Sequence, residues 1–166
     1  MGHYIYAIYV ASQDARLAAK AENQWPFATV KPVNEPFKGI AIIGHDTAHY
    51  SDEVDWDTKE LDNECFIADL PEFSKEFPDL NFVVMEEWDH GNCSSNQGIV
   101  FCNGKILLNE LGDEGTMLEK HSAALDAGTT NYFKIFDDIV RCLTAYLGVE
   151  LDKNAHFAPF DDDYFE

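Results

Sequence analysis

Basic residues are scarce in this chain. Its 166 residues include 11 Lys and Arg against 31 Asp and Glu, so the formal charge is −20. Only two arginines occur, Arg16 and Arg141, and the lysines are scattered. Nucleic acids and anionic membranes are bound through clusters of Lys and Arg, so the composition argues against both as direct partners. A basic protein is the partner that this charge predicts.

Other signals are missing as well. The four cysteines form no CxxC pair, and no apolar run approaches membrane-spanning length. The first residues lack the basic and apolar regions of a secretory signal. We therefore expect a reduced, cytoplasmic setting. The glycine-rich, Walker-type, GxSxG and HExxH motifs are absent too, and we expect neither an enzyme nor a bound cofactor.

The patterning predicts a single α+β domain over residues 1–166. Strands are expected at 3–11, 39–47 and 79–90, and a hairpin over 96–110 turns at Asn103-Gly104. Helices are expected at 12–25, 70–78, 116–128 and 129–148, and residues 27–38 are expected to form an extended loop. This order predicts an antiparallel sheet of four to five strands, with helices on one face and a C-terminal helical segment.

One stretch carries a resemblance to known domains. The sequences FSKEFPDLNFVVMEEW and GIVFCNGKI, within about residues 73–108, resemble the helix–strand–hairpin pattern of ferredoxin-like domains in uncharacterised phage and plasmid proteins. The resemblance lies in packing residues, and it implies a ferredoxin-like sandwich. Because such a fold hosts many activities, it implies little about function.

A histidine pair is the best metal candidate. His45 and His49 lie four residues apart, with Asp46 between them and further aspartates downstream. Imidazole and carboxylate suit zinc, manganese or iron. The pair follows a strand rather than lying on a helix, however, and the carboxylates do not have EF-hand spacing. We expect no metal here, and keep a metal-dependent enzyme as an alternative.

Two further groups invite catalytic readings. Asp89, His90 and Cys93 are close in sequence. No Lys or Arg lies nearby in sequence to lower the thiol pKa with a positive charge, which argues against a catalytic cysteine. Glu86 and Glu87 are neighbours on a strand, so they are expected to point to opposite faces and not to form a catalytic pair.

The main binding candidate is an acidic loop predicted at residues 45–64, with a solvated helix as the alternative conformation. Between Ser51 and Glu64 it has seven acids and one base, Lys59, together with Val54 and Trp56. An aromatic anchor among steering charges is typical of a protein-binding hot spot. An acidic aromatic tail at 150–166 has a similar composition. The alternative without a binding function is that Trp56 belongs to the core and the acids form a solvated face. The expected contact residues are Asp52, Glu53, Asp55, Trp56, Asp57 and Glu60.

The whole profile is small, acidic and without catalytic motifs. It resembles the immunity proteins that neutralise bacterial toxins, many of which are basic nucleases. The resemblance implies a cognate basic toxin bound through the acidic surface. A phage-encoded inhibitor that mimics DNA, acting on a host nuclease or defence complex, has the same charge and is the other alternative.

Overall fold

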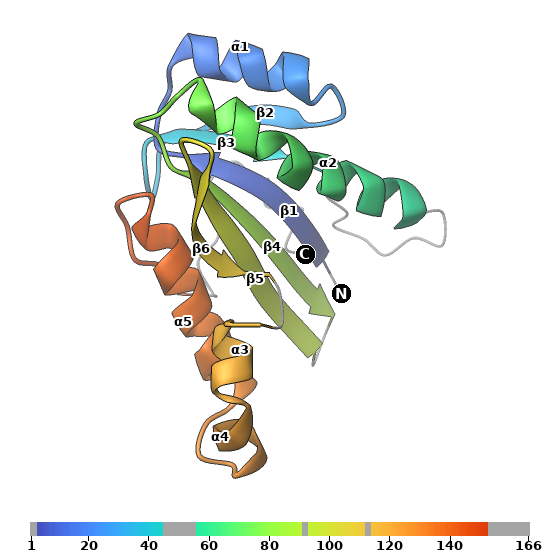
Figure 1. Cartoon of the computed structure of the whole chain (residues 1–166), viewed down its shortest axis with the longest axis vertical. Coiled ribbons are helices and arrows are strands. Elements are labelled where there is room, and N and C mark those ends of the chain that lie inside the picture. The colour runs from blue at the N-terminus through green and yellow to red at the C-terminus, as the bar shows by residue number, and fades with distance from the viewer. Residues whose placement is uncertain (1–2, 45–55, 91–92, 112–113, 153–166) are drawn as a thin grey trace.

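The computed structural model describes residues 3–44, 56–90, 93–111 and 114–152. Strands and helices are mixed in its first half, and helices follow the last strand (Figure 1). The elements are β1 (His3–Val10), α1 (Ala15–Gln24), β2 (Thr29–Val33), β3 (Gly39–Ile43), α2 (Trp56–Lys75), β4 (Phe82–His90), β5 (Cys93–Cys102), β6 (Lys105–Glu110), α3 (Met117–Lys120), α4 (Ser122–Asp126) and α5 (Tyr132–Ala145).

The described strands form one antiparallel sheet in the order β2-β3-β1-β4-β5-β6. The α+β class is confirmed, but the sheet has six strands instead of the four to five expected. The additional strand is β2, which the sequence analysis assigned to a loop because of its prolines. Pro32 is tolerated because β2 is an edge strand, where a missing N–H interrupts no further pairing.

Two helical connections cross the sheet in the same way. β1 and β3 are antiparallel, and so are β3 and β2, so α1 joins the parallel strands β1 and β2 with β3 between them. By the same argument α2 joins the parallel strands β3 and β4, with β1 between them. The central position of β1 follows from these two crossovers.

Both faces of the sheet are buried. Tyr6, Ile8 and Val10 of β1 pack against α1 and α2, while the alternate residues of β1 pack on the side covered by α5. The expectation of helices on one face is therefore wrong. Its physical reason is visible in β1, where the sequence YIYAIYV is apolar on both alternations, as in strands with two covered faces.

The acidic segment is in part helical. α2 begins at Trp56 and runs for 20 residues, so the prediction of a loop over 45–64 is wrong for residues 56–64. Residues 45–55 lie outside the described residues. The helix also passes through Pro71, which had been expected in a first turn. Burial of Phe66, Leu70 and Phe73 on both sides of Pro71 offsets the backbone hydrogen bond that proline removes.

Two local predictions are confirmed. Asn103 and Gly104 have φ values of 49° and 78° at the β5–β6 turn, as a type I′ hairpin requires. The Gly104 N–H donates to Ser74 Oγ at 2.8 Å, which ties this hairpin to α2. The helix predicted at 129–148 is α5, and its predicted apolar stripe is buried at Phe136, Ile139 and Leu143. Tyr132 and Phe133, predicted in the same stripe, are exposed. In the described part of the chain, no helix has the length and apolar composition needed to cross a bilayer.

Candidate binding surfaces

The predicted contact residues fall at the start of α2. The backbones of Trp56, Asp57 and Glu60 lie in its first turns, whereas Asp52, Glu53 and Asp55 lie outside the described residues. Positions 57, 60 and 64 are three and four residues apart, so they share one side of a helix. Counting 100° per residue puts that side opposite the buried positions 66, 70 and 73. Glu64 is exposed there.

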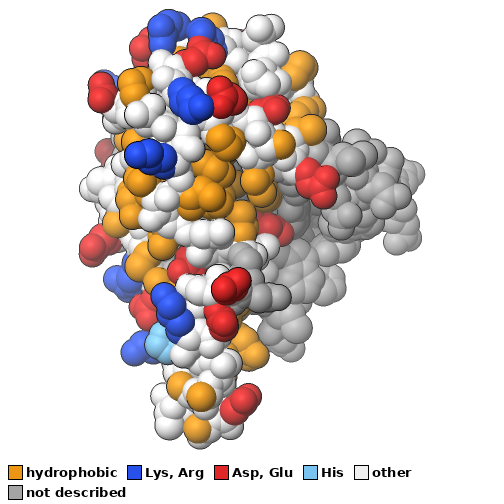
Figure 2. Space-filling model, in the orientation of Figure 1, with side chains coloured by type: hydrophobic (Ala, Val, Ile, Leu, Met, Phe, Trp, Pro, Cys, Tyr) orange, Lys and Arg blue, Asp and Glu red, His pale blue; other side chains and the backbone are white. Residues whose placement is uncertain are grey.

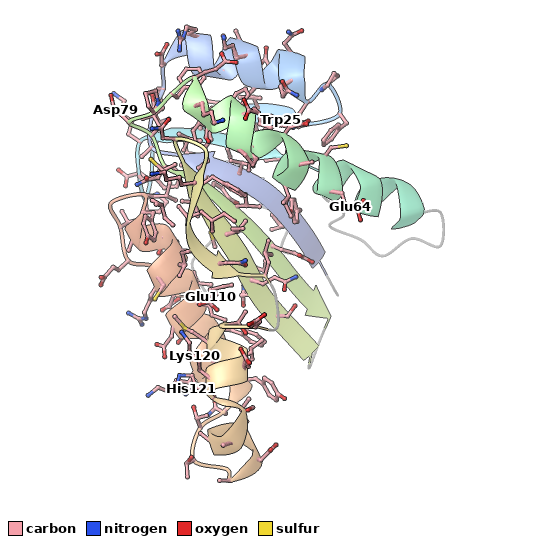
Figure 3. All side chains as sticks on the ribbon, viewed as in Figure 1. Trp25, Glu64, Asp79, Glu110, Lys120 and His121 are labelled. Carbon is pink, nitrogen blue, oxygen red and sulfur yellow. The ribbon has the colours of Figure 1, made fainter. Side chains whose placement is uncertain are left out.

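An aromatic cluster holds α2 against the sheet. Phe66 is fully buried, with its ring centroid 5.8 Å from that of Tyr6 and 5.3 Å from that of Trp25. Phe73 lies 4.6 Å from Trp25 by the same measure. Figure 3 labels Trp25, which follows the end of α1, and Glu64 on α2. The rings fix which side of α2 is turned outward.

The two neighbouring glutamates of β4 lie on opposite faces, as expected. Glu86 accepts a hydrogen bond from Gln97 Nε2 at 2.6 Å, across the β4–β5 pair. Glu87 is in register with Asn96, a buried side chain on the other face. The pair therefore offers no shared proton. Burial raises the pKa of the Tyr6 phenol, and the negative charge of Glu86 adds to the rise.

A pocket of about 310 Å³ opens where β6 leads into α3. The described residues of its lining include two carboxylates and no basic side chain: Gln97, Glu110, Leu111, Thr116, Leu118, Glu119 and Ile139. Glu110 is only 6% exposed, and its Oε2 accepts from the Met117 N–H at 2.8 Å. Glu119 Oε2 accepts from the Gly115 N–H. Figure 3 shows Glu110 at this junction, with Lys120 and His121 on the α3 side.

Sequence reasoning missed this pocket, although part of its signal was present. Thr116-x-x-Glu119 has the spacing of a helix capping box, and Thr116 Oγ1 does accept from the Glu119 N–H at 3.2 Å. The motif predicts the start of α3. It does not predict that Glu110, at the end of another element, supplies the second carboxylate.

The described residues add no support for a metal site or for a catalytic cysteine. Among the described residues, no group of three or more His, Cys, Asp and Glu could hold a metal ion. His45 and His49 lie outside those residues, so the metal alternative stays a prediction. The backbones of His90 and Cys93 are opposite each other in the β4–β5 register. Burial raises the pKa of another thiol, Cys142, and the charge of Glu110 is the next cause.

Comparison with protein-family models, with curated proteins and with solved structures gave no match.

Proposed function

We propose that this chain is a cytoplasmic binding protein that neutralises a basic partner, in the manner of an immunity protein acting on a toxin. The observation that carries the proposal is the acidic start of α2. It places Asp57, Glu60 and Glu64 at positions on the side of the helix that turns away from the core. A field of this kind raises the rate at which a basic protein is encountered, by about tenfold to a thousandfold.

We also infer that β1, α1, β2, β3, α2 and β4 form a ferredoxin-like unit. The support is the strand order β2-β3-β1-β4 and the two crossovers, each joining parallel strands with one antiparallel strand between them. On this assignment β5 and β6 extend the unit at one edge, and α5 covers the face that two crossover helices leave open. The fold presents the acidic helix but does not choose its partner.

Two variants of equal charge test the function. The α2 variant changes five acids in the first turns of α2 or just before it in sequence to the corresponding amides. They are Asp52, Glu53, Asp55, Asp57 and Glu60. The control variant changes five exposed acids elsewhere, for which no hydrogen bond or ion pair with another described residue is found: Glu22, Glu35, Asp79, Asp126 and Glu150. Each variant removes five negative charges, so both go from −20 to −15.

The experiment is affinity capture from the source cells with wild type and both variants, followed by association kinetics with the purified captured protein. We expect a basic protein that wild type and control retain, with the α2 variant associating more slowly and with a flatter salt dependence. Protection of cells that express the captured protein then tests neutralisation. Equal association rates for the two variants would remove the α2 assignment. Capture of a DNA-binding defence nuclease would favour the DNA-mimic alternative.

A further inference from the structure

The β6 edge of the sheet is unusually apolar. Ile106 is 54% exposed and Leu107 45%, and they are adjacent on the last strand of the sheet. Figure 2 shows hydrophobic side chains gathered over this part of the molecule, with carboxylates below them in that view. The opposite edge, β2, carries Pro32, which blunts it against pairing with another strand. β6 contains no proline and a single lysine, Lys105.

Part of β6 has the geometry that another strand needs. Its pairing with β5 is irregular at Val100/Phe101, but Leu108, Asn109 and Glu110 pair regularly with Val100, Ile99 and Gly98. An edge strand directs alternate N–H and C=O groups away from its neighbour, and an extended peptide can bond to them. The later half of β6 lies beyond this irregularity, and it is the half that leads to the Glu110 pocket.

The pocket determines what kind of side chain fits. Its carboxylates, Glu110 and Glu119, accept backbone N–H groups, and no Lys, Arg or His is among the described residues that line it. Leu111, Leu118 and Ile139 supply apolar walls. An Arg or Lys side chain matches this combination, because its stem is apolar and its head is cationic. A second copy of the chain is a poor occupant, since two bodies of charge −20 repel each other.

We propose that the later half of β6 pairs with an extended segment of a partner protein, and that an Arg or Lys of this segment enters the Glu110 pocket. Apolar residues of the same segment cover Ile106 and Leu107. This surface is separate in sequence from the α2 acids. It adds a strand-recognition site to the proposed function, and it does not require that the partner be a toxin.

The test uses a display library of short random peptides selected on the full chain. The edge variant, Ile106→Lys with Leu107→Lys, serves for counter-selection, because both residues are exposed and their replacement leaves the core intact. A pocket variant, Glu110→Gln with Glu119→Gln, removes both charges and keeps one carbonyl acceptor at each position. Glu119→Gln alone is the milder form, since Glu119 is exposed. Thermal unfolding checks that each variant is folded.

We expect selected peptides in which an Arg or Lys is flanked by alternating apolar residues. Their affinity should fall about tenfold or more on the edge and pocket variants and stay unchanged on the α2 variant. Replacing the peptide's basic residue with Gln should cause the same loss on wild type and little further loss on the pocket variant. Those backbone amides of residues 108–110 that point away from β5 should gain protection from hydrogen exchange when a peptide is bound.

Four results would overturn the proposal. The first three are a selection with no peptide that distinguishes wild type from the edge variant, peptides without a basic residue, and binding without new protection in β6. Peptides lost on the α2 variant alone would overturn it too, while leaving the proposed function standing. Conversely, loss on the edge and pocket variants with no captured basic protein would support the β6 site and count against the proposed function.

Discussion

A single added methyl group at Gly98 tests how β5 is packed beneath α5. A Cβ at this position would lie 2.3 Å from the carbonyl oxygen of Val84 and 2.7 Å from Cδ1 of Leu143. The first obstacle is backbone of the neighbouring strand, and the second is a fully buried side chain of α5. Neither can move away without disturbing the β4–β5 pair or the helix above it.

Gly98→Ala should therefore destabilise the fold. Overpacking of this kind costs about 1–3 kcal/mol. For a chain of this length that corresponds to a fall in melting temperature of roughly 2–12 °C. The opposite sign is expected where alanine fits, since Gly→Ala then stabilises by about 0.4–1 kcal/mol. Thermal and urea unfolding followed by circular dichroism measure the change. An unchanged or raised midpoint would refute the close approach of α5 and β4 to Gly98.

The Leu143→Ala background sharpens the test. By itself Leu143→Ala opens a cavity and should cost about 2–5 kcal/mol. It also removes one of the two obstacles to the new methyl group. The double variant should therefore lose less stability than the sum of the single losses. Strict additivity would mean that Gly98 and Leu143 do not share space, and the account of this face would fail.

Four further outcomes are expected, for Phe66, for the buried tyrosines and for Cys142. Phe66→Ala should cost about 3–5 kcal/mol in urea unfolding, because it empties the space between Tyr6 and Trp25, and a loss below about 1 kcal/mol would contradict that packing. Tyr6→Phe should be neutral or stabilising, since no partner for the buried Tyr6 hydroxyl is found among the described residues; a clear loss of stability would reveal one. Because burial raises the folded-state pKa values of Tyr6 and Tyr9, the wild-type urea midpoint should fall as the pH rises past their ordinary pKa of 10.0, and it should fall less in Tyr6→Phe. Cys142 should react with iodoacetamide more slowly than a free thiol at mildly alkaline pH, because its raised pKa leaves less thiolate; an equal rate would count against the burial argument.

Local patterns predicted local structure well. Asn-Gly at 103–104 tolerates the positive φ values of the hairpin turn, and the apolar stripe of residues 132–147 predicted α5. The failures lie where tertiary contacts override local preference. Pro32 suggested a loop because proline suits a strand only at an edge, and edge position is a property of the whole sheet. Pro71 suggested a helix start because proline is common in a first turn. The aromatic contacts that hold the helix on both sides of Pro71 come from distant parts of the chain.

The candidate sites also differ in whether local sequence could predict them. The acids of residues 51–64 are close together in sequence, so the sequence was sufficient to find this cluster. The pocket joins Glu110 at the end of β6 to Glu119 in α3, and its apolar wall includes Ile139 of α5. No sequence spacing connects these residues, because their proximity depends on the path of the chain after β6. The expectation that Glu86 and Glu87 point apart succeeded because alternation along a strand is a local rule.

Local helix stability explains only some of the acids at the start of α2. Negative charge favours a helix N-terminus, but this effect fades beyond the first turn, which contains Asp57. Asp62 and Glu64 lie further on, and Glu60 and Glu64 are four apart, a spacing at which like charges destabilise a helix by about 0.2–0.5 kcal/mol. Two explanations remain for these charges, solubility and a long-range field that attracts a partner. Solubility needs only the total charge, whereas capture of a partner depends on where the charge lies, and this is why two variants of equal net charge can separate the two explanations.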